Sequence, residues 1–365
     1  MLNDTNWTSD FYILTQEEAI TVQSTLHPFI FFLMWLNVFL TTGGNLVTII
    51  AFLRDKNIYS KPGNMLILNL AFADLKVGLV SLPWFNLWLH YGDWIFGEHL
   101  CKWWVIVDYA ATIESMLAML LISWDRLFMV ENIQKYIRNQ TRNRVVSVII
   151  GSWLLCYAFC MFAVLLVEPI TGERNIDYTV DCDFPPNFYL SVTIFEVIIL
   201  FVIPVFALFY FNTKIFYIIR KRAKSVRPET LTAPMSHVVD PNQNKNSTSF
   251  ANQNHQHQQE SSSRHNEHAD EESTNHQVTR RSLHKDRKAA ITLTLLVVTF
   301  ILCWAPYNFV IIMELVSVNS VPTAFASFTE YLLWLNSVIN PFLYVATNPL
   351  FRKQLKKMFS CKYHD

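Results

Sequence analysis

Charged side chains are scarce in this sequence. They make up 16% of the 365 residues, against about 25% in soluble globular proteins. The 29 basic and 29 acidic residues cancel, so there is no bulk positive charge to attract a nucleic acid. Six cysteines are too few for a disulfide scaffold at this length. Hydrophobic residues reach 52%, with 28 phenylalanines and 11 tryptophans, which indicates a protein that crosses a membrane several times.

Seven apolar stretches have the length of a transmembrane helix, about 20 residues. Backbone polar groups in a bilayer must bond within their own segment or a closed barrel, and these stretches lack the alternation of barrel strands. The sequence therefore predicts an all-α membrane protein, a bundle of seven transmembrane helices. The predicted spans are 28–53, 64–89, 100–130, 145–167, 188–219, 288–316 and 323–346.

Lys and Arg lie almost entirely on one side of these spans. They gather in four segments, at 54–63, 131–144, 220–287 and after 346. The other side carries only Lys102 and Arg174. Because short cytoplasmic loops hold the excess of positive charge, we expect a multi-pass plasma-membrane protein with an extracellular N-terminus.

The polar segment before the first span is predicted to lie outside the cell. Residues 1–27 contain no Lys or Arg, so they are not a cleavable signal peptide. Glycosylation sequons begin in this segment at Asn3 and Asn6. Helices one to five with their loops follow, over 28–219.

Two further segments lie on the cytosolic side. Residues 220–287 are rich in Asn, Gln, Ser and His, which predicts a long disordered third intracellular loop rather than a metal site. Helices six and seven follow, over 288–346. Residues 347–365 alternate basic and apolar side chains, so we expect a short amphipathic helix on membrane lipid, then a tail. Cys361 in that tail is a candidate for palmitoylation, or a free thiol.

Polar side chains inside the spans are costly in hydrocarbon and are therefore candidate functional residues. The set comprises Asn45, Asp74, Asp108, Glu114, Asp125, Arg126, Trp153, Asn336 and Asn340, with the strings NLAFAD (69–74), CWAPY (303–307) and NPFLY (340–344). Together and in this order they resemble the aminergic branch of the rhodopsin-like G-protein-coupled receptors. The resemblance covers all seven spans. It assigns no role to Glu114 or to Lys76.

The resemblance implies that Asp108 binds the ammonium group of an amine ligand. Arg126 lies 18 residues later, about 27 Å along a helix, so the two residues mark opposite ends of the third span. Aromatic ring faces would stabilise the same cation. The alternative is a buried carboxylate that pairs within the bundle. The other expected cavity residues are Tyr109, Thr112, Trp304, Tyr307, Asn308, Tyr331 and Trp334.

The likeness is strongest to histamine receptors. The tryptophan at position 334 resembles a subset of histamine receptors, whereas the asparagine at position 308 resembles muscarinic acetylcholine receptors. Glu196 is the candidate acceptor of a hydrogen bond from the imidazole of histamine. It lies about one helical turn from the position where histamine receptors carry an acid. The alternative is that Glu196 is a structural acid that does not contact the ligand. Glu330 would add a third acid and favour a di- or polyamine. An opsin is excluded because 323–346 contains no Lys for a Schiff base.

A polar cluster is expected deeper in the bundle. Ser115 lies seven residues after Asp108, on nearly the same helix face. The resemblance implies a sodium site, and oxygen ligands suit a hard cation; a water-filled network is the alternative. The expected ligands are Asp74, Ser115, Asn336 and Asn340.

Signalling residues are implied by the same resemblance. Arg126 would pair with Asp125 and, across the bundle, with Asp286. Pro306 and Pro341 would bend helices six and seven. Tyr344, the last residue of the string NPFLY (340–344), is a further expected switch residue. A disulfide would join Cys101 to Cys182.

The expected protein is a biogenic-amine receptor, with histamine first and acetylcholine or a polyamine as alternatives. Its expected partners are a heterotrimeric G protein, with the inhibitory type as a hypothesis, and arrestin. It is not expected to be an enzyme, to need a cofactor beyond possible Na⁺, or to bind nucleic acid. An amine transporter or channel is the alternative from another class, although the two halves show no internal repeat.

Overall fold

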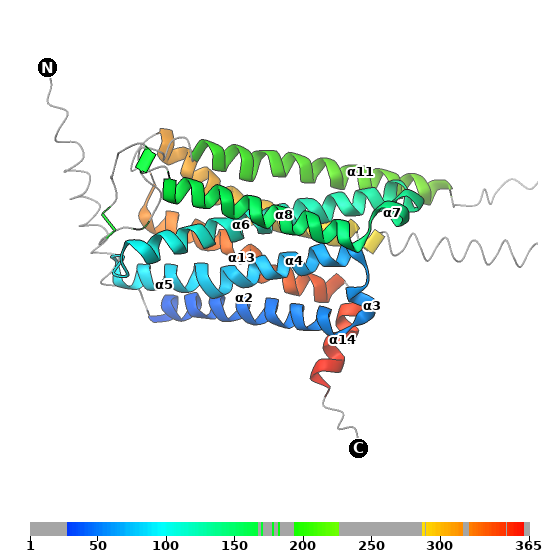
Figure 1. Ribbon diagram of the computed structural model, residues 1–365, viewed down its shortest axis with the longest axis horizontal. Helices are drawn as coiled ribbons and strands as arrows, with labels where there is room; N and C mark the ends of the chain where they lie inside the picture. Colours follow the sequence, from blue (N-terminus) through cyan, green and yellow to red (C-terminus); the bar gives the residue numbers. More distant parts are fainter. Residues whose placement is uncertain are drawn as a thin grey trace, which may run out of the picture.

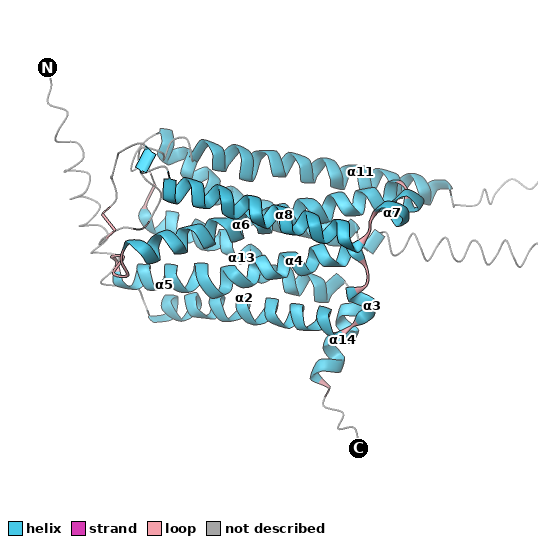
Figure 2. Cartoon of the chain, viewed as in Figure 1, coloured by secondary structure: helices cyan, strands magenta, loops and turns pink. Residues whose placement is uncertain are grey.

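The computed structural model describes residues 28–166, 169–170, 177–178, 182, 193–225, 287–288, 290–316, 321–347 and 349–360. Long helices run side by side along the long axis of the molecule (Figure 1), and Figure 2 shows no strand in the part of the chain that is described. The all-α bundle predicted from the sequence is confirmed.

Seven long helices correspond to the seven predicted spans. The first six are long and apolar enough to cross a membrane: Pro28–Arg54 (α2), Pro62–Tyr91, Glu98–Glu131 (α6), Arg142–Leu166, Thr193–Lys224 and Ala290–Val316. The seventh is α13, Thr323–Thr347, with 25 residues. At 1.5 Å per residue it is about 37 Å long, enough to span a bilayer core.

Three of these spans change helix type along their length. The second consists of α4 (Pro62–Lys76), the π-helical η1 (Val77–Ser81) and α5 (Leu82–Tyr91). The fourth consists of α8 (Arg142–Met161) and η2 (Phe162–Leu166), and the fifth contains η3 (Glu196–Val202) and α11 (Ile203–Ser225). In the second span, Pro83 lacks the N–H that a regular helix needs, and η1 ends two residues before it.

Helix α6 lies at the centre of the bundle, in contact with α4, α8 and α11. Helix α2 packs on α4 and on η1. Its approach to η1 requires Gly78, since a Cβ atom there would lie 2.7 Å from Thr42 Oγ1 and 2.9 Å from Thr42 N. Large apolar side chains face outward: Phe39 is 73% exposed and Leu155 is 72% exposed. Such a surface suits lipid rather than water.

Short helices close one end of the bundle. They are α3 (Lys56–Tyr59), α7 (Ile133–Asn139) and α14 (Pro349–Phe359). Helix α14 turns away from the bundle axis (Figure 1). It buries Phe351 against Phe52 and Tyr344 and exposes Arg352 and Lys353, so it is the expected amphipathic helix. We call this the α14 end, and the opposite end, where Cys101 bonds to Cys182, the disulfide end.

Candidate ligand-binding site

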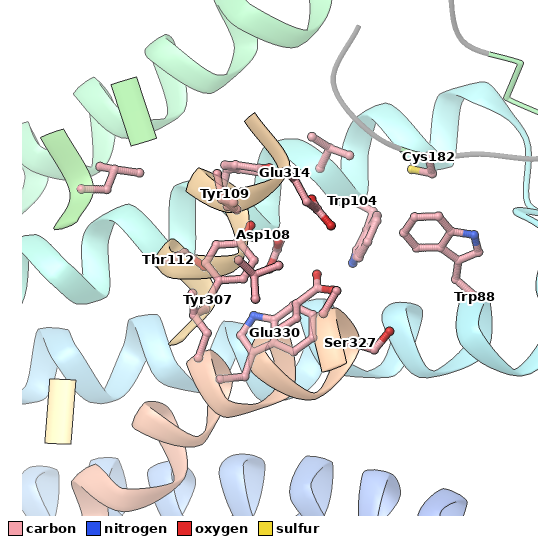
Figure 3. Close-up of a pocket in the computed structure, with 17 residues that line it drawn as sticks. Trp88, Trp104, Asp108, Tyr109, Thr112, Cys182, Tyr307, Glu314, Ser327 and Glu330 are labelled. Carbon is pink, nitrogen blue, oxygen red and sulfur yellow. The ribbon is translucent and has the colours of Figure 1, made fainter. Parts of the chain in front are cut away.

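A cavity of about 260 Å³ lies near the disulfide end, between α5, α6, the helix Ala290–Val316 and α13 (Figure 3). Six of the expected cavity residues line it: Asp108, Tyr109, Thr112, Tyr307, Glu330 and Trp334. The structure therefore brings together side chains that are more than 200 positions apart in the sequence.

Asp108 is the acid at the centre of this cavity. Its Oδ1 atom is buried and meets no donor within hydrogen-bond geometry among the residues that are described, although the Ser81 hydroxyl lies near enough to interact with the carboxylate. No described residue that lines the cavity is Lys, Arg or His. A buried charge without a counter-ion is costly, so this carboxylate is suited to bind a cation that enters from outside.

Aromatic side chains form the wall of the cavity and hold one another in place. The Trp334 ring lies 4.6 Å from Phe85 and 5.9 Å from Tyr331, edge to face in both cases. The Tyr331 hydroxyl donates to Asn86 Oδ1. Trp88 and Trp104, 6.1 Å apart, extend the wall towards the disulfide end. The ring faces of the tryptophans that line the cavity offer cation–π stabilisation to a cation bound at Asp108.

Three of the expected residues do not line the cavity. Trp304 is buried against Phe300, with ring centroids 5.0 Å apart. Asn308 is buried and donates to the Trp304 carbonyl at 2.9 Å. Tyr331 packs edge to face against Trp334 and does not itself line the cavity. The side chain of Glu196 falls outside the described part of the structure, although its backbone begins η3.

Several lining residues were missed by sequence reasoning, and the largest or most polar of them are Trp88, Trp104, Glu314 and Ser327. Three of these four carried a usable signal. Trp104 precedes Asp108 by four residues, Glu314 follows Tyr307 by seven, and Ser327 precedes Glu330 by three, so helical periodicity places each near the face of a predicted cavity residue. The position of Trp88 depends on how separate helices pack, which periodicity does not show.

The disulfide between Cys101 and Cys182, implied by the resemblance, is present. It bridges a sequence separation of 81 residues, and Cys182 itself lines the cavity. The bond therefore fixes part of a connecting segment at the mouth of the site.

The buried acid of the second span, Asp74, accepts three hydrogen bonds. The donors are Ser115 Oγ at 2.9 Å, Ser337 Oγ at 2.9 Å and Asn340 Nδ2 at 2.7 Å. Asn336 was expected here, but Ser337 takes that place because it is the residue that α13 turns towards α4. The Oδ1 atoms of Asn336 and Asn340 are buried without a donor in the part of the chain that is described. Asn340 contacts Asp74 directly, and its oxygen without a donor beside a carboxylate suits a hard cation such as Na⁺.

Glu114, which had no assigned role, accepts hydrogen bonds from side chains of two neighbouring helices, α4 and α8. Asn69 Nδ2 donates at 2.7 Å and Ser152 Oγ at 2.8 Å, and Cys156 Sγ lies at 3.7 Å. Trp153 Nε1 donates to Asn69 Oδ1 at 2.8 Å. Glu114 is therefore the centre of a structural network that joins α4, α6 and α8.

Lys76, also without a role from the sequence, is covered by aromatic rings of α8. Its Nζ atom lies 3.7 Å from the centre of the Trp153 ring and donates to Tyr157 Oη at 2.9 Å. The ring faces and the nearby Glu114 carboxylate compensate this ammonium in place of water. Lys76 therefore points away from the Asp74 cluster.

The Arg126 side chain acts electrostatically on the adjacent Asp125 carboxylate, but no hydrogen bond joins the two in the part of the chain that is described, so their expected ion pair stays a prediction. Asp125 instead accepts hydrogen bonds from Gln140 Nε2 at 2.8 Å and Tyr136 Oη at 3.1 Å. Burial and the adjacent Asp125 carboxylate raise the pKa of Tyr136, so the phenol keeps its proton and donates. Neutral donors around α7 thus satisfy the carboxylate. The second expected partner of Arg126, Asp286, lies outside the described residues.

Two contacts tie the α14 end of α6 to α11. Lys214 Nζ lies 2.5 Å from Glu131 Oε1, and Arg222 donates to the Val130 carbonyl. Both side chains of the ion pair are more than a third exposed, so this pair contributes little. The Tyr344 hydroxyl is buried with no partner in the described ranges. Pro306 and Pro341 both lie inside helices, and the bends expected at them stay a prediction.

Comparison with known proteins agrees with this architecture. Residues 44–344 match the family "7 transmembrane receptor (rhodopsin family)". The chain belongs to this family, whose members are receptors and not enzymes, and it is a multi-pass membrane protein.

Several curated receptors are similar to the chain. It is 27% identical to the human histamine H4 receptor, over 91% of this chain and 92% of that receptor. It is 26% identical to the human 5-hydroxytryptamine receptor 1E, over 89% and 90% of the two chains. The muscarinic acetylcholine receptor gar-2 of Caenorhabditis elegans is 32% identical over 44% of this chain and 26% of its own length.

Proposed function

We propose that this protein is a receptor for a small biogenic amine, whose ammonium group pairs with Asp108. One observation carries the proposal: the buried Oδ1 atom of Asp108 meets no donor within hydrogen-bond geometry among the described residues, and it lies in an aromatic cavity without a described basic side chain. An ammonium ion supplies both the missing donor and the missing charge, and aromatic rings stabilise it where water is excluded.

Histamine is the ligand that we favour. The relatives named for histamine include the H4 receptor, which aligns along nearly the whole chain. Histamine carries an ammonium and, across a two-carbon spacer, an imidazole that can donate to an acid, for which Glu196 of the fifth span is the candidate. Acetylcholine is second, supported by Asn308 and by the muscarinic relative. Another amine or a polyamine is third.

Binding would open the α14 end to a heterotrimeric G protein, of the inhibitory type by resemblance to histamine receptors. A ligand shifts such an equilibrium only if it binds one state more tightly. Arg126, Asp286, Pro306, Pro341 and Tyr344 are the proposed switch residues. A sodium ion at Asp74, Ser115, Asn336 and Asn340, and arrestin as a second partner, complete this proposal.

The disulfide end would face the outside of a plasma membrane, with the N-terminus extracellular. Lys and Arg gather at the other end. Glycosylation at Asn3 and Asn6, a disordered loop at 220–287 and palmitoylation at Cys361 belong to the same proposal. Asn3, Asn6, Cys361 and residues 226–286 lie outside the described residues, whereas residues 220–225 are helical and end α11.

Asp108→Asn tests the central contact. The variant keeps the size of the side chain and removes its charge. We expect at least a 100-fold loss of amine potency, about 2.8 kcal/mol, because loss of one member of a desolvated charge pair costs 2–5 kcal/mol or more. The measurement is the concentration of histamine, acetylcholine and other amines that activates G proteins in cells expressing the chain.

Glu98→Gln is the matched control. Glu98 is an acid at the same end of α6, pairs with Lys102 at 2.7 Å and does not line the cavity. Its amine potency should stay within a factor of three. Unchanged potency in Asp108→Asn, at equal surface expression, contradicts the proposed function. Amine flux without G-protein activation would favour a transporter.

A further inference from the structure

Two polar side chains meet behind the wall of the cavity, and neither of them lines it. The hydroxyl of Tyr331, on α13, donates to Oδ1 of Asn86, on α5, across a sequence separation of 245 residues. Asn86 is 0% exposed, and its Nδ2 atom is buried with no acceptor within the described ranges. The amide is therefore only half satisfied, by the contact with Tyr331.

A half-satisfied amide inside a membrane span is costly to the fold. A leucine has nearly the same size and would fill the space without an unpaired polar atom. Stability therefore does not explain the asparagine at position 86. A buried polar group that costs stability requires another explanation, and the partner of this one belongs to the support of the cavity wall.

The ring of Tyr331 belongs to a group of three rings that orient one another. It lies 5.5 Å from Phe85 and 5.9 Å from Trp334, edge to face in both cases. Phe85 itself lies 4.6 Å from Trp334, again edge to face. Of these three rings, Trp334 is the one that lines the cavity. Because aromatic pairs favour defined angles, a fixed Tyr331 restricts the angle of the Trp334 ring.

Helix α13 is joined to the second span on both sides of η1. Before η1, Asp74 accepts a hydrogen bond from Ser337 at 2.9 Å. After η1, Asn86 accepts from Tyr331. Trp334 lies between these two donors in the sequence of α13. A helix that is held on both sides of a residue turns less about its own axis, so the second contact also restricts where Trp334 points.

We propose that Asn86 and Tyr331 are positioning residues for the amine ligand. Their hydrogen bond holds the ring of Trp334 where its face stabilises an ammonium group bound at Asp108. Neither positioning residue touches the ligand. This inference rests on the proposed function, because it assigns the ammonium to Asp108.

Tyr331→Phe removes the hydroxyl and keeps the ring. The measurement is the dissociation constant of histamine, or of acetylcholine if histamine does not bind, on the full chain in membranes. We expect it to rise three- to tenfold. A purely structural role would reduce the amount of folded receptor and leave the dissociation constant of the folded molecules unchanged. A rise below threefold overturns the inference, and so does the failure of both amines to bind the unaltered chain.

Asn86→Leu tests whether the two residues act as one unit. Alone, it leaves the Tyr331 hydroxyl without its acceptor, and we expect a loss of affinity similar to that of Tyr331→Phe. The combined variant removes both polar partners, so its loss should not exceed the larger single loss. Losses that multiply show two independent effects and contradict the proposed pair.

Trp334→Leu tests the route from Tyr331 to the ligand. The variant lowers affinity by itself, because it removes a ring face from the cavity. In its presence, the further change Tyr331→Phe should alter the dissociation constant less than twofold, since there is no Trp334 ring left to position. A full threefold loss in that background shows that Tyr331 acts by another route and overturns its assigned role.

Tyr157→Phe is the matched control. The Tyr157 hydroxyl bonds to Lys76 at 2.9 Å, also between two spans, and Tyr157 does not line the cavity. Its loss should leave the dissociation constant within a factor of two. A rise equal to that of Tyr331→Phe indicates a general effect of a lost hydroxyl and overturns the inference.

Asp108→Asn separates the two possible failures. If this variant weakens amine binding while Tyr331→Phe leaves it unchanged, only the positioning role fails. If Asp108→Asn leaves amine binding unchanged, the proposed function fails and the positioning role fails with it.

Discussion

Two acids of the same helix have different surroundings. Asp108 and Glu114 are six residues apart on α6, and both lie within the span. Glu114 accepts hydrogen bonds from Asn69 and Ser152, whereas Asp108 Oδ1 meets no donor within hydrogen-bond geometry among the described residues. A buried acid that the protein satisfies contributes to structure, and one that it leaves unsatisfied is a candidate for ligand binding. The difference depends on neighbouring helices.

Glu196→Gln tests the choice of histamine over acetylcholine. An imidazole N–H would make a stronger hydrogen bond to a carboxylate than to an amide, and the quaternary head and ester of acetylcholine offer no such donor. We expect histamine to lose at least tenfold in potency and acetylcholine less than threefold, measured as G-protein activation in cells. An equal loss for both amines removes the reason to prefer histamine.

At the scale of elements, buried polar contacts join α4, α6 and α8. Asn69 of α4 connects Trp153 of α8 to Glu114 of α6. Lys76 of α4 lies over the rings of Trp153 and Tyr157. Helices in lipid gain little from hydrophobic contact with each other, so packing and such hydrogen bonds hold them together.

Glu114→Ala should destabilise this three-helix contact. The change removes the acceptor for Asn69 and leaves this buried amide unsatisfied, at a cost of about 1–3 kcal/mol, whereas the Ser152 hydroxyl can still donate to the Ile149 carbonyl. We expect the melting temperature of the purified protein to fall by several degrees. Glu131→Ala is the control, since its exposed pair with Lys214 is worth about 0–1 kcal/mol. Equal melting temperatures for the two variants contradict a structural role for Glu114.

At the scale of the whole molecule, one covalent bond links distant parts of the chain at the mouth of the site. The Cys101–Cys182 disulfide joins the start of α6 to a residue that lines the cavity. A bond across 81 residues restricts an unfolded chain by about 4 kcal/mol in the chain-entropy account. Membrane-embedded helices keep much of their order when unfolded, so the measured effect should be smaller.

Removal of this bond should affect stability and binding together. The double variant Cys101→Ser with Cys182→Ser should melt several degrees lower and bind the amine about tenfold more weakly, because Cys182 would no longer be fixed at the cavity. Reductant should bring the native protein to the same melting temperature and leave the variant unchanged. A reductant effect of equal size on the variant would show that another thiol is responsible.

The sequence by itself determined the spans and the residues that are unusual inside them. A run of apolar residues crosses a bilayer for reasons of length and hydration alone, so the seven long helices were predictable. Asp74 and Asp108 were identified in the same way, because a carboxylate in hydrocarbon is costly whatever surrounds it. The amphipathic helix α14 followed from the local alternation of Lys and Arg with apolar residues.

Only the tertiary structure decided which of these residues meet. Ser337 rather than Asn336 bonds to Asp74, and Gln140 and Tyr136 rather than Arg126 bond to Asp125. Helical periodicity relates Glu314 to Tyr307, but its place in the same cavity as Asp108 and Glu330 depends on three helices that pack around one space. Neighbours of this kind depend on the rotation and separation of packed helices. Those quantities arise from contacts across the bundle, while hydrophobic length belongs to each segment alone.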